Sequence, residues 1–295
     1  MKLMGLNKML PIAQAKGYGV GSFSARNTFL IKYVLMAAEE LNSPVIVQMS
    51  ANEFRWFEVS ATEFGEAFHK VKDQFSIVAG LHLDHTKDIN VIKEAIDAGF
   101  TSVMIDASDK DLDKNIEITK EVVEYAHAKG VSVEAELGRI GATDKLETDS
   151  DDEFYTIPEE AKRFVEETGV DALAVSIGTA HGVYAVKDPK IDFDRLKEIR
   201  SLVKTPLVLH GGSGLPIETI KNSINIPEGG VSKINIATDL ELVFLKALGK
   251  EKRLLNKEIW QLDAELLEKA GMAVKEEVKK KIQEYLGSAD KSADF

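Results

Sequence analysis

The sequence predicts a single (β/α)₈ (TIM) barrel, an α/β fold. Eight short apolar runs rich in β-branched residues recur along the 295 residues, with helical patterns between them. Strict strand–helix alternation implies a parallel sheet, whose strands are buried on both faces and therefore read as near-continuous apolar runs. Eight such units favour a closed barrel over an open doubly wound sheet, and the chain is slightly longer than the roughly 250 residues of a one-domain barrel.

The predicted strands are the runs that carry this apolar signal: 19–24, 44–49, 76–83, 101–106, 131–137, 171–177, 206–211 and 232–237. Between them, "NVIKEAIDAG" and "NIEITKEVVEYAHAKG" place apolar residues at helical spacing and end on Gly, a common helix stop. The N-terminal "MKLMGLNKMLPIAQAKG" indicates a short amphipathic helix. We therefore expect one barrel domain over 1–287, with this helix and C-terminal helices, and a disordered tail at 288–295.

Charge and cysteine content exclude several classes of protein. The net charge of −12 is spread along the chain without the basic cluster that nucleic acid or an anionic membrane requires, so we expect neither partner. No run approaches the ~18 apolar residues of a membrane span. The chain has no cysteine, which favours a cytoplasmic protein and leaves His, Asp and Glu as metal ligands.

Polar residues gather where the predicted strands end. In a barrel of this kind, the chemistry lies on the loops at the C-terminal ends of the strands. Four of the six histidines lie there, whereas His69 and His127 fall in helical patterns. Residues far apart in sequence would thus converge on one mouth: Ser50, His82, Asp84, His85, Asp106, Glu136, His181, His210 and Asn235.

Histidines from three different strands predict a metal site. Neutral imidazoles on separate strands are the usual ligands of a catalytic zinc that keeps one position open, and we select His85, His181 and His210. His82 and Asp84 have the same parity along their strand and share a face, which leaves Asp84 free for proton transfer. Glu136 and Asp106 are candidates for a further ligand or for acceptors that orient the imidazoles.

Glycine-rich segments follow the last strands. "GTAHG" (178–182), "HGGSG" (210–214) and "NIAT" (235–238) each place small residues just after a strand. The loops after strands seven and eight form the common phosphate site of such barrels, through backbone N–H groups and helix N-termini. A phosphorylated small substrate is therefore expected.

These motifs carry a family resemblance. The ordered set "LHLDHT", "SVMIDAS", "VSVEAELGRIG", "GTAHGVY", "LVLHGGSG" and "KINIAT" resembles class II (zinc-dependent) ketose-bisphosphate aldolases of the fructose- and tagatose-bisphosphate type, over roughly residues 5 to 285. The resemblance implies a homodimer or homotetramer that reversibly cleaves a ketose 1-phosphate or 1,6-bisphosphate into dihydroxyacetone phosphate and an aldehyde. Its enediolate intermediate would be stabilised by Zn²⁺.

The resemblance also implies residue roles. His85, His181 and His210 would bind zinc, with Glu136 as an alternative ligand, and Asp84 would be the acid/base that protonates the acceptor carbonyl. Backbone oxygens of Ala180, Gly182 and Gly211 would seat a monovalent cation, Na⁺ or K⁺. Dihydroxyacetone phosphate would be held by Gly182, Gly211, Gly212, Ser213, Asn235, Ile236, Ala237 and Thr238, with Asn235 also counted as catalytic.

The chain departs from the family pattern in three places, one of which is Ser24, where an asparagine is common. "ELGRIGATDK" (136–145) has Asp144 where a loop glutamate normally removes the substrate proton, and other loop acids between 147 and 153 are alternatives. The usual "DPR" near the C-terminus is replaced by "QLDAE" (261–265). Ser50 matches a position that helps to hold the distal phosphate, and Arg55 is a candidate replacement anchor. Since Arg binds phosphate, carboxylate or sulfonate, all three distal groups remain open.

Two other chemistries compete with this interpretation. A metal-dependent hydrolase would use the same histidines to activate water, but it does not require "HGGSG" plus "NIAT". A Schiff-base aldolase would need a lysine inside the barrel, for which Lys233 is the candidate, and would leave the histidines unused.

Overall fold

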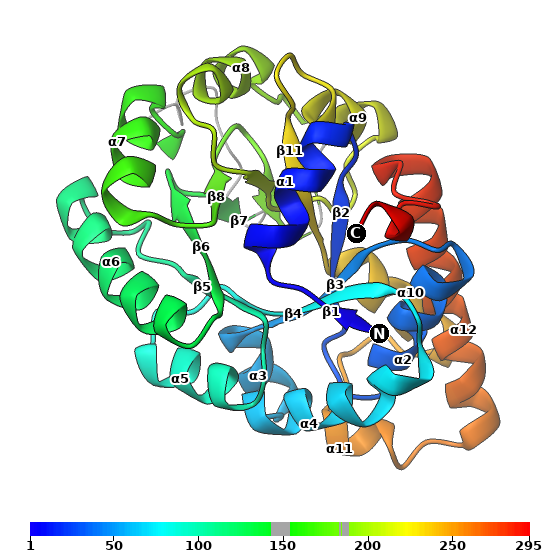
Figure 1. Cartoon of the computed structure of the whole chain (residues 1–295). Coiled ribbons are helices and arrows are strands. Elements are labelled where there is room, and N and C mark those ends of the chain that lie inside the picture. The colour runs from blue at the N-terminus through cyan, green and yellow to red at the C-terminus, as the bar shows by residue number, and fades with distance from the viewer. Residues whose placement is uncertain (143–153, 183, 185–188) are drawn as a thin grey trace.

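The computed structural model describes residues 1–142, 154–182, 184 and 189–295, and it contains a closed barrel of eight parallel strands (Figure 1). Each barrel strand pairs with its neighbours in parallel, and the last pairs with the first, which closes the ring. The predicted fold is confirmed, and each strand lies within or beside a predicted run: β2 (Val20–Ser24), β3 (Val45–Ser50), β4 (Val78–Asp84), β5 (Ser102–Ile105), β6 (Ser132–Leu137), β8 (Ala172–Val175), β10 (Leu207–Leu209) and β11 (Val231–Ile236).

A helix follows each barrel strand and packs outside the ring: α2 (Ile31–Glu40), α4 (Ala61–Val71), α5 (Ile89–Asp97), α6 (Leu112–Ala128), α7 (Pro158–Thr168), α8 (Phe193–Leu202), α9 (Ile217–Ile224) and α10 (Thr238–Leu248). The described residues also form the helices α1 (Leu6–Lys16), α3 (Ala51–Phe57), α11 (Asn256–Ile259) and α12 (Ala264–Lys280). Three two-residue strands were not predicted because they are too short for a periodic pattern: β1 (Lys2–Leu3), β7 (Gly141–Ala142) and β9 (Ala180–His181).

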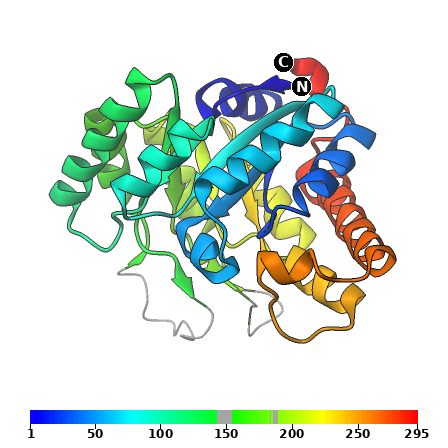
Figure 2. The ribbon, with the colours of Figure 1, turned by 90° about the horizontal axis from the view of Figure 1, so that it is seen from below.

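Helix α1 closes the N-terminal end of the barrel. Its apolar residues Leu6, Met9 and Leu10 are buried against the inward side chains at the starts of the strands, including Val20 and Ile46. The chain ends lie at this same end of the molecule (Figure 2). The barrel therefore has an apolar floor, and its polar chemistry is confined to the opposite end.

The barrel interior changes character along the strands. Because side chains alternate between the two faces of a strand, every second residue points inward. Above the floor, these inward positions carry buried polar side chains: Ser22, Gln48, His82, Glu134 and Lys233. The next inward position, two residues further along each of these strands, is also buried and polar. These residues are Ser24, Ser50, Asp84, Glu136 and Asn235.

The C-terminal segment packs on the barrel. Helix α12 contacts α2 and α10, and continues as a π-helical turn over Lys281–Leu286. Residues 288–295, expected as a disordered tail, pack on the loop between α2 and β3 and on α1: Ser288 is fully buried beside Ser43, and Asp294 lies 2.5 Å from Lys16 Nζ. Among the described residues, no helix is both long enough and apolar enough to cross a membrane.

Candidate active site

A cavity of about 770 Å³ opens at the C-terminal ends of the barrel strands. Its wall includes Ser50 from β3, Asp84 from β4, Glu136 from β6 and Asn235 from β11, together with His181 from β9. The polar strand ends identified in the sequence therefore meet at one mouth.

The three selected histidines converge beside this cavity. His85 Nε2 lies 3.2 Å from His181 Nε2 and 2.6 Å from His210 Nδ1. One ring nitrogen from each of the three histidines lies within 4.8 Å of the others, in an arrangement able to hold a metal ion. His82 lies apart from this group, in a buried cluster with Asp84 and Glu134.

The outer hydrogen bonds of two histidines show why this cluster suits a cation. His85 Nδ1 faces Asp106 Oδ2 at 3.1 Å, and His210 Nε2 faces Glu134 Oε1 at 2.8 Å. A nitrogen that faces a carboxylate carries the proton, so in each neutral ring the other nitrogen presents a lone pair to the centre. Two lone pairs at 2.6 Å repel each other, so a proton or a metal ion must lie between or beside them. The donor set therefore fits a metal ion.

Glu136 supports the same conclusion. Its Oε2 is buried without a hydrogen-bond partner, 3.9 Å from His85 Nδ1 and 3.7 Å from His210 Nδ1. Burial raises the pKa of this carboxyl to about 8. This buried carboxyl oxygen beside the imidazoles is placed to add a ligand when the group loses its proton, as the sequence suggested.

The three imidazoles differ in the direction in which their pKa values are shifted. Burial lowers the pKa of His181 to about 4 and that of His210 well below its usual range, which keeps both rings in the neutral form that binds metal. Burial also opposes a charge on His85, but Asp84 and Asp106 raise its pKa to about 10. The carboxylates around His85 therefore favour a positive charge at this place.

Asp84 is fixed by two amide side chains. Gln48 Nε2 donates to its Oδ2 and Asn235 Nδ2 donates to its Oδ1, both at 3.0 Å. Burial opposes ionisation, yet the positive charges of His85 and Lys233 lower the pKa of Asp84 to about 2. The carboxylate is therefore ionised, oriented and at the cavity wall.

Beneath these groups lies a buried ion pair. Lys233 Nζ is 2.8 Å from Glu134 Oε2, and both side chains are fully buried. Lys233 also donates to Asn235 Oδ1 at 2.8 Å. Since its ammonium is held by this pair and does not line the cavity, Lys233 supports Asn235 and is not placed to attack a substrate carbonyl.

The glycine-rich loops form the side of the cavity next to His181. Gly182, Gly211, Ser213, Ala237 and Thr238 line it. Gly211 has φ +67°, and a Cβ there would lie 2.3 Å from Ala180 O, so only glycine fits this close approach. Two further residues assigned to substrate binding, Gly212 and Ile236, do not contribute to the wall: Gly212 N donates to Asn235 O at 2.9 Å, and Ile236 is fully buried.

Comparison with known proteins decides the family. A family model described as class-II fructose-bisphosphate aldolase matches residues 4–291. The chain belongs to this family. Among solved structures, it is similar to the YdjI aldolase from Escherichia coli K12, with 34% identity, 98% of this chain and 99% of that chain covered, and a TM-score of 0.83.

Two more solved structures share the fold. A candidate fructose-1,6-bisphosphate aldolase from Coccidioides immitis is 28% identical, with 98% of each chain covered and a TM-score of 0.83. A fructose-bisphosphate aldolase from Campylobacter jejuni is 24% identical, with 98% of this chain and 97% of that chain covered and a TM-score of 0.80. The protein is thus a lyase that performs dihydroxyacetone-phosphate-type aldol cleavage, which decides against the hydrolase.

The side of the aldolase cavity next to α3 has a different arginine from the one selected in the sequence. Arg55 is exposed on α3, where its guanidinium donates to Asn52, and it does not line the cavity. Arg253 does, with its guanidinium carbon 4.8 Å from the Trp56 ring centre and two bonds to Glu241, at 2.7 and 3.0 Å. Ser50 also lines the wall, where its hydroxyl accepts from Glu53 N at 3.2 Å and caps α3.

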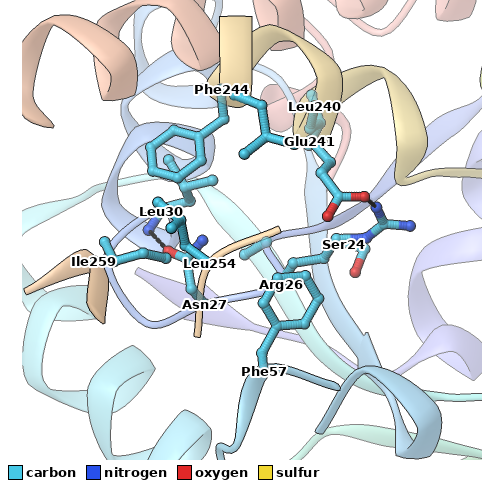
Figure 3. Close-up of a pocket in the computed structure, with 12 residues that line it drawn as sticks. Ser24, Arg26, Asn27, Leu30, Phe57, Leu240, Glu241, Phe244, Leu254 and Ile259 are labelled. Atoms are coloured by element: carbon cyan, nitrogen blue, oxygen red, sulfur yellow. Dashed lines mark hydrogen bonds and ion pairs between the residues drawn. The ribbon is translucent and has the colours of Figure 1, made fainter. Parts of the chain in front are cut away.

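Arg26 completes this side of the aldolase cavity. It is buried between Glu53, 2.7 Å from its Nε, and Glu241. Figure 3 shows the Arg26–Glu241 pair at the edge of a small, mainly apolar pocket lined by Phe57 and Phe244, and the same pair also lines the main cavity. Two arginines and two glutamates thus form a charge-balanced wall.

Sequence reasoning missed several of these residues, and Asp144 lies outside the described residues. Glu134 shares the parity of Glu136 within "VSVEAEL", so alternation could have placed it inside the barrel. Gln48 was a detectable signal as the single amide in an apolar run. Arg253 follows α10 in a loop, where no periodic pattern indicates the direction of a side chain.

Glu134 should control metal affinity without being a ligand. Glu134→Gln weakens the acceptor of His210 Nε2–H, so we expect Zn²⁺ affinity to fall about 10- to 100-fold, as for other residues that orient a ligand. Competition for Zn²⁺ with a chromophoric chelator measures this affinity. Glu166→Gln, at an exposed glutamate, is the matched control. Unchanged affinity in a folded Glu134→Gln protein would show that this hydrogen bond does not orient His210.

Proposed function

We propose that this aldolase reversibly cleaves a ketose 1-phosphate, with Zn²⁺ held by His85, His181 and His210. The observation that carries the proposal is the convergence of three imidazole nitrogens within 4.8 Å, beside an oriented Asp84. When bound there, zinc supplies positive charge that polarises the substrate ketone and stabilises the enediolate. Glu136 is a further ligand candidate.

The protein residues supply proton transfer and binding. In the cleavage direction, ionised Asp84 takes the proton of the C4 hydroxyl while the C3–C4 bond breaks and the aldehyde forms. In condensation, the same group returns that proton to the aldehyde oxygen. Asn235 and Gln48 hold the carboxylate in place through both steps. The second proton, at C3 of the enediolate, is assigned to Asp144 or another acid of the same loop.

The phosphate of dihydroxyacetone phosphate is assigned to the glycine-rich loops. Gly182, Gly211 and Ser213 lie together with Ala237 and Thr238 at the start of α10. A helix N-terminus with small residues around it suits an anion. The Na⁺ or K⁺ ion, the homodimer or homotetramer, and the cytoplasmic location stay predictions: the first two follow from family resemblance and the third from the cysteine-free sequence.

Metal removal tests the proposal directly. EDTA should abolish release of dihydroxyacetone phosphate, Zn²⁺ should restore it, and borohydride with substrate should have no effect, because no Schiff base forms. His181→Ala should lose activity and bound zinc, since one of three ligands is gone. The exposed helical histidine variant His127→Ala should retain both. A fully active His181→Ala enzyme that still binds zinc would contradict the assignment of His181 as a zinc ligand.

Asp84 should be needed for turnover far more than for metal binding. Proton transfer by a positioned side chain contributes about 10² to 10⁴ in rate, so Asp84→Ala should lower kcat by that factor and leave zinc content unchanged. Asp97→Ala, at an exposed aspartate on α5, is the control. If kcat were the same in both variants, Asp84 would not be the acid/base.

Arg253 should select the distal end of the substrate, because it lines the cavity next to Arg26 and its side chain is partly exposed. For substrates ending in phosphate, carboxylate or sulfonate, Arg253→Ala should lower kcat/KM about 10- to 100-fold, the worth of a hydrogen bond to a charged group. Arg55→Ala, the matched control at an exposed arginine of α3 that does not line the cavity, should change it little. Equal effects of the two variants on every substrate would remove Arg253 from this role.

A further inference from the structure

Lys281 is a buried cation that lies outside the metal site and close to the phosphate loops. Its side chain is 3% exposed. The ammonium nitrogen lies 2.5 Å from Asp239 Oδ2, 3.6 Å from Glu277 Oε1, and 4.1 Å from the Tyr285 ring centre. It belongs to the π-helical turn Lys281–Leu286, a local widening that frequently marks functional positions.

Asp239 links this cation to the loop after β10. Its Oδ2 accepts from Gly214 N at 3.2 Å. Its own N–H, and that of Ala237, donate to Ser213 Oγ at 3.3 and 3.0 Å. Asp239 therefore joins the first turn of α10 to Ser213 and Gly214, so the loops after β10 and β11 are held as one unit.

The charge of Asp239 creates a conflict at this place. A carboxylate in the first turn of a helix is favourable for the helix itself, because it faces the positive end of the helix dipole. A phosphate at the same helix end would be repelled by it, since like charges a few ångströms apart interact strongly in a partly buried site. Lys281 pairs with Asp239 and so removes this repulsion.

We propose that Lys281 is a positioning residue that neutralises Asp239, so that the Ser213–Gly214 loop and the start of α10 can accept the substrate phosphate. This role rests on the phosphate site assigned under the proposed function. Lys281 itself does not line the cavity and needs no contact with the substrate.

Charge variants separate this role from simple packing. With the zinc-loaded enzyme, Lys281→Met should weaken binding of inorganic phosphate and raise KM for dihydroxyacetone phosphate about tenfold or more, because Asp239 is left uncompensated. Its kcat should fall by a smaller factor. Asp239→Asn should bind phosphate as tightly as the wild type or more tightly, since a negative charge beside the phosphate is removed while the positive charge of Lys281 stays. Lys281→Arg and the double variant Lys281→Met/Asp239→Asn should both recover binding.

Calorimetric titration with inorganic phosphate, together with steady-state kinetics and thermal unfolding, measures these effects. A role in packing alone would make both single variants bind phosphate more weakly and would give no recovery in the double variant; that result overturns the inference. Wild-type affinity in a folded Lys281→Met enzyme overturns it as well. If the wild type bound neither phosphate nor dihydroxyacetone phosphate, the proposed phosphate site itself would be wrong. This outcome is distinct from the results that contradict the role of Lys281 alone.

Discussion

The ion pair between Lys233 and Glu134 is the interaction on which the site depends. Two charges taken out of water are costly, and such a pair persists when additional hydrogen bonds satisfy both partners. Here Glu134 also faces His210 Nε2, and Lys233 also donates to Asn235 Oδ1. Asn235 in turn holds Asp84. One buried pair that spans the barrel from β6 to β11 therefore sets the geometry of a metal-ligand candidate and of the proton-transfer group together.

The same architecture explains what the sequence could reveal. Buried parallel strands are legible as apolar runs, and a residue at the end of such a run must face the mouth, so His85, Glu136 and Asn235 could be placed without coordinates. Alternation along a strand also placed Asp84 beside His82. The ion pair was not predictable, because its members lie about 100 residues apart in strands that are not neighbours in the sheet.

Other features depend on contacts that leave no local pattern. Arg253 and Lys281 follow the last barrel strand, and their importance comes from Glu241 and Asp239 on α10, against which the later chain happens to pack. Residues 288–295 have the short, polar composition of a tail, yet Ser288 Oγ meets Ser43 Oγ at 3.0 Å. Composition describes how much apolar surface a segment could bury, whereas such side-chain contacts are decided by tertiary structure.

The apolar floor formed by α1 has a consequence for solvent. Leu6, Met9 and Leu10 fill the N-terminal end of the barrel, so water approaches the buried charges above them from the cavity side. The apolar floor keeps the local dielectric constant low beneath Lys233 and Glu134. Their electrostatic interactions with the groups at the cavity are therefore less screened than they would be in water. The N-terminal ends of the eight strands thus contribute packing, and the C-terminal ends hold the active site. The loops at the C-terminal ends can therefore change in sequence without altering the apolar packing at the other end.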